Sequence, residues 1–158
     1  VVSGSECRSI FRVDVSGLVL GGQLARLPGS KVFPGKVMTN ILAMRAAAIL
    51  GFLAVALGAF GAHGLKALLV QNGTLAIWEK AVLYHFIHTV MLFVLAHRRP
   101  VLTGAWLSFF FGIVIFSGSL YLLAVTNVKW LGAITPIGGA SFLVGWLWLV
   151  FVAGRPER

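Results

Sequence analysis

The segment LGAFGAHGLKA, Leu57 to Ala67, decides whether the first hydrophobic stretch of this chain belongs to the fold. Small residues such as Ala59 and Gly61 suit the cleavage site of a signal peptide. They also continue a series of small residues whose spacing of three and four places them on one helix face. The series is Ala47, Gly51, Ala54, Gly58 and Gly61. Because a discarded peptide needs no packing face, we interpret the segment as the outer end of a first membrane-spanning helix.

The composition is that of an integral membrane protein. The chain has 158 residues, of which 59% are hydrophobic and 11% charged, whereas soluble domains are about 25% charged. A formal charge of +9 would suggest nucleic acid in a soluble protein. Here the basic residues form short clusters between apolar runs, as topology signals do, so no nucleic-acid partner is expected. The single cysteine, Cys7, excludes an intramolecular disulfide and a CxxC site.

Residues 1–37 differ from the rest of the chain, because they contain no apolar run long enough to span a membrane. We expect them to be a disordered leader or an over-extended start, since MTNILAMRAAAILGF from Met38 resembles a normal beginning of a small membrane protein. The alternative is a short amphipathic element on the membrane surface, but the polar residues form no helical stripe.

Four apolar runs follow Met38, and a spanning helix needs about 20 residues. They cover about 42–62, 75–96, 102–125 and 134–153. We therefore predict one transmembrane domain over 38–158, an all-α four-helix bundle of antiparallel transmembrane helices in the lipid bilayer. In the loop before the second run, Thr74 is the predicted N-cap.

The basic residues predict the orientation of this bundle. One side receives Arg45, Arg98, Arg99, Arg155 and Arg158, and the other receives Lys66, Lys80 and Lys129. Because positive residues are retained in the cytoplasm, both termini are expected to be cytoplasmic.

Small residues also form seams on the third and fourth runs. Helices in lipid gain no hydrophobic energy from meeting, so close packing through small residues must supply the attraction. The seams comprise Gly104, Ser108, Gly112 and Ser119 on the third run, and Gly138, Ser141 and Gly145 on the fourth. The tryptophans of this region, Trp106, Trp130, Trp146 and Trp148, are interpreted as interface-belt or packing residues.

The second run carries polar side chains into the membrane. His85 and His88 share one face with Trp78, and exposing histidines to lipid is costly, so this face is predicted to look into the bundle. Polar residues of the other runs reach the same depth in the outer half. The candidate ligand-binding residues are His63, Trp78, Glu79, His85, His88, Ser117, Ser119, Tyr121 and Thr135.

Three interpretations of the histidine pair remain open. The pair could be neutral and hydrogen-bonded to neighbouring hydroxyls, could respond to protons or a ligand, or could bind a metal or haem. No carboxylate or cysteine lies at that depth, so no metal and no cofactor is expected. Glu79, one turn into its helix, is expected near the membrane surface, paired with a lysine or His63, rather than as a buried proton-coupling carboxylate.

No catalytic arrangement is recognisable, because the chain has no Ser-His-Asp set, phosphate-binding glycine loop or paired carboxylates; an enzyme is not expected. The leading hypothesis is a membrane protein whose polar cluster binds a small ligand or a partner helix. The alternatives are a small oligomeric transporter, against which the lack of a carboxylate in the first span counts, and a structural or assembly subunit of a membrane complex.

Four motifs in fixed order also resemble a known family. They are GAFGAHGLK (58–66), WEKAVLYHFIH (78–88), FSGSLYLL (116–123) and LGAITPIGGASFLVGW (131–146). This pattern resembles domain-of-unknown-function family 423, the YgdD-like small inner-membrane proteins of bacteria. The resemblance covers roughly Met38 to Ala153 and implies a multi-spanning protein of the bacterial plasma membrane, with no established substrate, reaction or cofactor.

Overall fold

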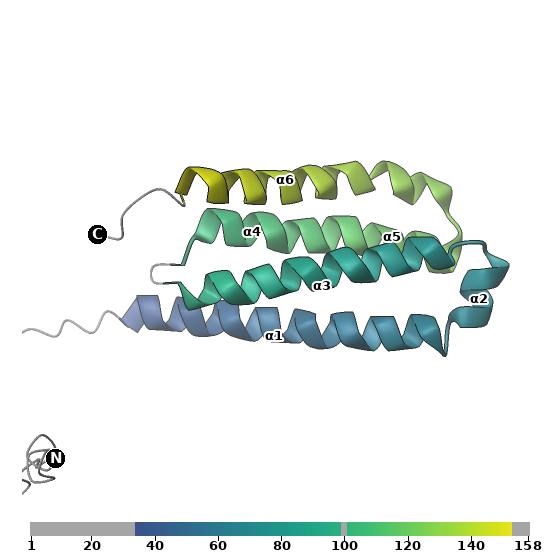
Figure 1. The fold of residues 1–158 in the computed structure, drawn as a ribbon, viewed down its shortest axis with the longest axis horizontal. Helices are drawn as coiled ribbons and strands as arrows, with labels where there is room; N and C mark the ends of the chain where they lie inside the picture. The colour runs from purple at the N-terminus through teal and green to yellow at the C-terminus, as the bar shows by residue number, and fades with distance from the viewer. Residues whose placement is uncertain (1–33, 99–100, 153–158) are drawn as a thin grey trace, which may run out of the picture. The chain divides into compact units, whose positions relative to one another are not determined.

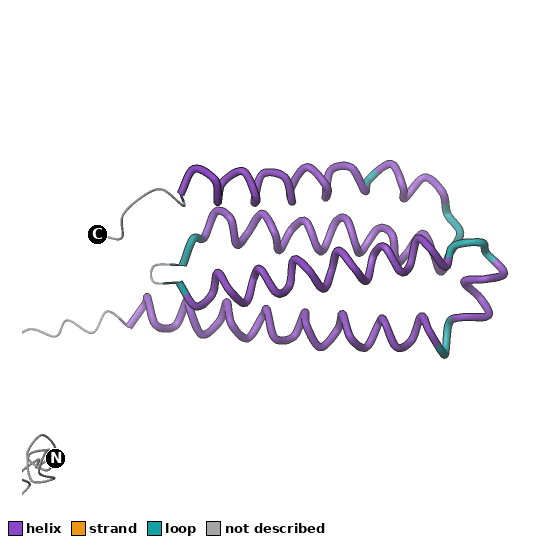
Figure 2. The backbone as a smooth tube through the Cα atoms, in the orientation of Figure 1, coloured by secondary structure: helices purple, strands orange, loops and turns teal. Residues whose placement is uncertain are grey.

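The computed structural model describes residues 34–98 and 101–152, with side chains from Asn40 onward. Residues 1–33, which hold most of the expected leader, lie outside the described residues. Every described element is helical (Figures 1 and 2). In chain order they are α1 (Pro34–Ala62), α2 (Lys66–Gln71), α3 (Leu75–His97), α4 (Thr103–Gly112), the π-helix η2 (Ile113–Ser117), α5 (Gly118–Thr126), the 3₁₀-helix η3 (Lys129–Ala133) and α6 (Thr135–Val152).

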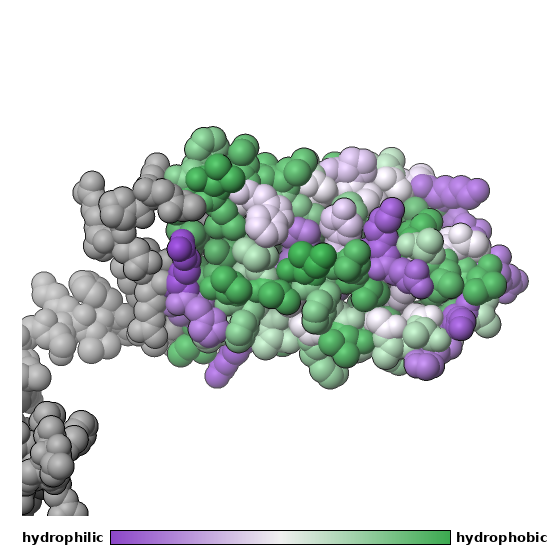
Figure 3. All heavy atoms as spheres, viewed as in Figure 1, coloured by the Kyte–Doolittle hydropathy of each residue, from purple (hydrophilic) through white to green (hydrophobic). Residues whose placement is uncertain are grey.

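Four helical stretches are long and apolar enough to cross a membrane, which confirms the predicted all-α membrane fold. They are Asn40–Ala62, Leu75–His97, Thr103–Thr126 and Lys129–Val152. At a rise of about 1.5 Å per residue, 23 or 24 residues exceed the roughly 30 Å of a hydrocarbon core. Figure 3 shows the most hydrophilic side chains towards the two ends of these helices and mainly hydrophobic ones between them.

The helices pack side by side in the order α1, α3, the third span (α4, η2 and α5) and α6, each antiparallel to the next (Figure 1). Among the described residues, α1 packs along α3 and touches α2, but has no comparable packing on α4, α5 or α6. The end of the bundle that carries α2 and η3 is called the α2 end below. The opposite end, with Arg45 and Arg98, is called the arginine end.

Small residues join α1 to α3, as the sequence predicts. Ala47 and Ala54 are each 1% exposed. A Cβ added at Gly51 would lie 3.6 Å from the Thr89 methyl group. At Gly61 an added Cβ would overlap the Trp78 ring, whose indole N–H donates to the carbonyl of Leu57 at 3.0 Å. The seam therefore lets the α1 backbone approach α3 closely.

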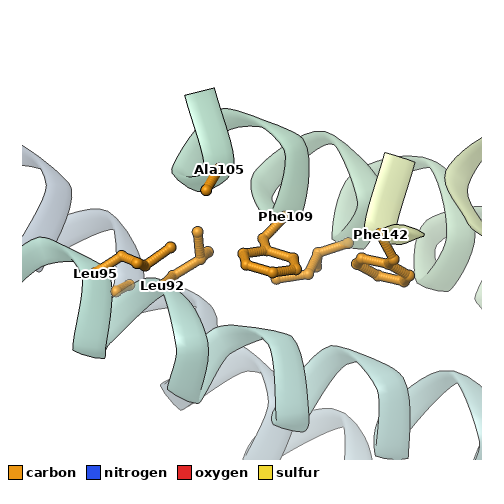
Figure 4. Close-up of a cluster of buried hydrophobic side chains, with 7 residues drawn as sticks. Leu92, Leu95, Ala105, Phe109 and Phe142 are labelled. Carbon is orange, nitrogen blue, oxygen red and sulfur yellow. The ribbon is translucent and has the colours of Figure 1, made fainter. Parts of the chain in front are cut away.

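Aromatic rings that fill glycine notches join the third span to α6. From the arginine end inwards, Gly104, Phe109, Gly112 and Phe116 of the third span face Trp148, Gly145, Phe142 and Gly138 of α6. A Cβ at Gly104 would lie 2.7 Å from Trp148, and one at Gly145 would lie 2.7 Å from Phe109. Figure 4 shows Phe109 and Phe142 in the buried cluster that also contains Leu92 and Leu95 of α3.

The third span contains a feature that the sequence did not predict. Its middle five residues, Ile113–Ser117, form a π-helix with α-helix on both sides. A π-helical turn accommodates an extra residue and so changes the facing of the residues beyond it; such turns often occur at functional sites. Here it carries Ser117, which is 1% exposed.

The loop between α2 and α3 caps a different helix from the expected one. Thr74 does occupy the N-cap position of α3, but its side chain makes no capping bond there. Its hydroxyl instead donates to the carbonyl of Ala124 in α5 at 2.8 Å. Asn72 donates to the carbonyls of Ala124 and Val125, each at 3.2 Å. These bonds satisfy carbonyls in the last turn of a spanning helix, where intrahelical donors are lacking.

Candidate functional site

The predicted site residues fall into distinct environments. Trp78, His85, His88, Ser117 and Ser119 are buried, Tyr121 and Thr135 are half-buried, and His63 and Glu79 are exposed at the α2 end. The two exposed residues are thus separated from the interior group, which lies between α3, the third span and the neighbouring helices.

His88 has both ring nitrogens occupied. Its Nδ1 lies 2.8 Å from the carbonyl oxygen of Tyr84, which only accepts, so Nδ1 carries the proton and donates. Its Nε2 then accepts from the indole N–H of Trp146 at 3.2 Å. The ring also stacks on Phe142, with centroids 3.6 Å apart and planes 9° from parallel. His88 is therefore a neutral structural histidine without a free lone pair.

Trp146 is the residue of this contact that sequence reasoning missed, because it was interpreted with the other tryptophans as a belt or packing residue. It is 41% exposed, as a belt residue is, yet its N–H points at the interior histidine. The pair joins α3 to α6, two helices that are 58 positions apart at this point. Nothing in the local sequence distinguishes this tryptophan from Trp148 two positions later.

His85 differs from His88, because only one of its ring nitrogens has a partner. Its Nδ1 lies 3.3 Å from the hydroxyl of Tyr121 on α5. Its Nε2 is buried and makes no hydrogen bond. The carbonyl of Leu50 in α1 also interacts with the imidazole, although its contact does not meet the distance and angle of a hydrogen bond to Nε2. The whole residue is 4% exposed, so the free nitrogen faces the interior and not lipid.

Two hydroxyls close to His85 also lack partners. The Oγ1 of Thr89 and the Oγ of Ser117 are buried without a hydrogen bond, and the residues are 4% and 1% exposed. Thr89 lies one turn from His85 on α3, and Ser117 one turn from Tyr121 on the antiparallel third span. Because His85 meets Tyr121, Ser117 comes to the depth of Thr89. We call His85, Thr89 and Ser117 the His85 centre.

Ser119, Thr135 and Trp78 form their contacts outside this centre. The hydroxyls of Ser119 and Thr135 lie 2.9 Å apart and join the third span to α6. Trp78 bonds to α1 and packs on Tyr121 with ring centroids 4.7 Å apart. These contacts explain why the fold needs the residues without requiring a ligand.

The His85 centre is a set of neutral hydrogen-bonding groups. One imidazole nitrogen and two hydroxyls offer donors and acceptors but no formal charge. Among the described residues, no group of three or more histidine, cysteine or acidic side chains could hold a metal ion. Most buried polar groups in proteins are hydrogen-bonded, so three unpartnered ones at one depth require an explanation.

Comparison with known proteins places the chain among bacterial membrane proteins. The model of the family described as protein of unknown function (DUF423) matches residues 57–139. The chain is 47% identical over 113 residues to the UPF0382 membrane protein YwdK of Bacillus subtilis, covering 67% of this chain and 90% of that one. It is 39% identical over 125 residues to the UPF0382 inner membrane protein YgdD of Escherichia coli, covering 77% and 95%.

A UPF0382 membrane protein of Staphylococcus epidermidis is 49% identical over 108 residues, covering 65% of this chain and 87% of that one. No solved structure matches the chain. The family match spans the end of α1, all of α3 and the third span, and thus includes all three residues of the His85 centre. With four spanning helices in the described residues, the chain is a multi-spanning membrane protein that belongs to the DUF423 family of unknown function.

Proposed function

We propose that this protein is a non-enzymatic binding protein of the bacterial plasma membrane, which holds a small uncharged molecule at the His85 centre. The observation that supports this function is the group of three buried polar atoms, on α3 and η2, that lack hydrogen-bond partners. Leaving such groups unpaired costs about 1–3 kcal/mol each. A ligand with a hydroxyl or carbonyl group would remove that cost on binding.

The chemistry of the centre favours a neutral ligand over an ion. Its three side chains carry no charge, and in the sequence from Met38 to Val152 the single acidic residue, Glu79, is exposed at the α2 end. An ion buried in this environment would lose its hydration without gaining a counter-charge. The polar atoms also face inwards, so a partner helix would reach them only by displacing α1.

The proposal predicts a ligand-dependent signal from one of the two interior histidines. In lipid nanodiscs with ¹⁵N-labelled histidine, addition of benzyl alcohol should shift the ring signals of His85 and leave those of His88 unchanged, since the nitrogens of His88 are already bonded. His85→Ala should abolish the benzyl alcohol dependence of the thermal midpoint. His97→Ala is the matched control, because it removes an exposed histidine from the same helix.

Two outcomes would count against ligand binding at this centre. Unchanged His85 signals across benzyl alcohol, phenol and short alkanols would remove the proposal. Reproducible copurification of one membrane complex that is lost with His85→Ala would favour the assembly alternative instead. Flux of a solute into vesicles that contain only this protein would extend the proposal to transport.

We also propose that the arginine end faces the cytoplasm. Arg45 and Arg98 are exposed at this end, and Lys66 and Lys129 are exposed at the other. The support for this orientation comes from the whole sequence, in which the arginines after Met38 fall on one side of the membrane. In intact cells of a Cys7→Ser background, Lys129→Cys should react with a membrane-impermeant maleimide, and Arg98→Cys should react only after lysis. The reverse pattern would invert the orientation.

A further inference from the structure

The position of the His85 centre along the bundle limits how a ligand can reach it. Trp78 lies about two turns from His85 towards the α2 end, and Leu92 lies about two turns towards the arginine end. Each of these residues belongs to a buried apolar cluster. The centre therefore lies between two hydrophobic cores, one on the side of each water-facing end.

Both clusters are closely packed. At the α2 end, Leu69 and Ala124 are 0% exposed and surround Trp78. Towards the arginine end, Leu92 and Phe109 are 0% exposed in the cluster shown in Figure 4. A molecule that entered from water along the bundle axis would have to open one of these cores, whose packing is close and costly to disturb.

The wall on the side of α1 is of a different kind. The Thr89 methyl group faces Gly51, where an added Cβ would lie 3.6 Å from it, and small residues of the seam lie on either side of Gly51 along α1. Among the described residues, the side-chain hydrogen bond between α1 and another helix is the one from Trp78 to Leu57, near the α2 end. Because α1 makes no packing on the third span or α6 comparable to that on α3, its displacement would leave those helices packed on each other, while separating Ala47 and Leu57 from the two apolar clusters.

The opposite wall is interlocked and hydrogen-bonded. Aromatic rings occupy glycine notches along the third span and α6, Ser141 donates to the carbonyl of Ser108 at 2.8 Å, and Ser119 bonds Thr135. Tyr121, the partner of His85, is only half-buried, and it lies on α5, on which α1 does not pack. The centre is thus bounded by interlocked, hydrogen-bonded helices on one side and by the single outer helix α1 on the other.

We infer that the His85 centre is loaded sideways from the bilayer, past α1, so that its ligand is an uncharged lipid-dissolved molecule with at least one hydroxyl or carbonyl group. This inference rests on the proposed function and names both the source and the class of its ligand. Molecules of this class accumulate in the hydrocarbon region, where the outer face of α1 lies.

A reversible clamp between α1 and α3 tests the route. A Cβ at Gly58 would lie 3.4 Å from Cγ1 of Val82, close to where the Sγ of a cysteine at Val82 would lie, so the two positions are near enough for a disulfide. Val82 is about one turn from His85. The variant Gly58→Cys with Val82→Cys, in a Cys7→Ser background, would therefore fasten α1 beside the centre when oxidised and release it when reduced.

The measurement is the exchange rate of benzyl alcohol at His85, from ¹⁵N line broadening in nanodiscs. Oxidation should slow the exchange at least tenfold, and reduction of the same sample should restore the rate of the Cys7→Ser protein. The His88 signals report whether the clamped fold is intact. The variant Ala54→Val places a larger side chain in the seam without a crosslink, so it should loosen α1 and speed up the exchange.

The possible outcomes test the lateral route and the binding site separately. Equal exchange rates in the oxidised and reduced states would overturn lateral loading while leaving His85 as a binding site. The absence of any benzyl alcohol effect at His85 in either state would overturn the proposed function, and the route with it. Slowed exchange with unchanged His88 signals supports the lateral route.

Discussion

The contact between Gly138 of α6 and the π-helix provides a sharp test of the packing between α6 and the third span. A Cβ added at Gly138 would lie 2.7 Å from Cα and 2.8 Å from Cβ of Phe116. The obstacle is backbone, which cannot rotate away as a side chain can. Gly139, the next residue, is the matched control, because a Cβ there would lie 3.8 Å from the Phe116 ring, an ordinary contact.

The magnitude follows from the required displacement. The nearest atom to the added Cβ is the backbone nitrogen of Phe116. To bring it out to a tolerable contact, α6 and η2 must separate by about 1 Å, and gaps of this size forfeit about half of the dispersion energy across them. Overpacking typically costs about 1–3 kcal/mol, and a backbone clash belongs at the upper end. The higher helix propensity of alanine stabilises the folded protein by up to about 1 kcal/mol at either position, which offsets part of this cost at Gly138.

We therefore expect Gly138→Ala to lower the free energy of unfolding by about 2 kcal/mol, while Gly139→Ala leaves it unchanged or raises it by up to about 1 kcal/mol. Reversible titration with dodecyl sulfate in mixed micelles, followed by tryptophan fluorescence, measures both variants. Equal stabilities of the two variants would refute the reasoning, because the predicted difference of about 2–3 kcal/mol depends entirely on the close approach of α6 to η2.

Three further variants test the polar contacts by the same titration. Trp146→Phe keeps an aromatic ring, although a smaller one, but removes the donor to His88, and should cost about 1–2 kcal/mol; an unchanged stability and unchanged ¹⁵N shift of His88 Nε2 would contradict that bond. Thr74→Val removes the hydroxyl that bonds the Ala124 carbonyl, and should cost about 1–2 kcal/mol, whereas a neutral result would mean that Asn72 alone satisfies the carbonyl. Ser117→Ala removes an unpartnered hydroxyl and should stabilise the ligand-free protein by about 1 kcal/mol while weakening benzyl alcohol binding; a loss of stability would show that Ser117 has a structural partner.

The helices and their packing faces were largely predictable, and the reason is local. A chain in lipid must satisfy its backbone hydrogen bonds internally, so an apolar run of sufficient length becomes a helix. Small residues spaced by three and four then mark the face that meets another helix. This argument correctly predicted that Ala47, Ala54 and Gly61 lie on one packing face of α1, and that Gly138 and Gly145 lie on a packing face of α6.

The partner of each face was not predictable in the same way. Small residues indicate that a neighbouring helix comes close, but they do not indicate which ring packs against the glycine. Trp78, Trp148 and Phe142 all come from segments far away in the sequence. The cap on α5 is a further example. Thr74 has the residue type and position of an N-cap for its own helix, yet the carbonyl of Ala124, 50 residues away, accepts its hydrogen bond.

By itself, the sequence determined that this chain spans a membrane four times and that His85 and His88 face inwards, because hydrophobicity, length and helical periodicity are properties of single segments. Only the tertiary structure separated the two histidines. Three residues correspond to about 300° around a helix, so the two rings leave α3 in directions about 60° apart. One meets Trp146 of α6, and the other meets Tyr121 of α5 and the side of α1 that carries the Leu50 carbonyl. That divergence leaves one histidine satisfied and the other with a free nitrogen.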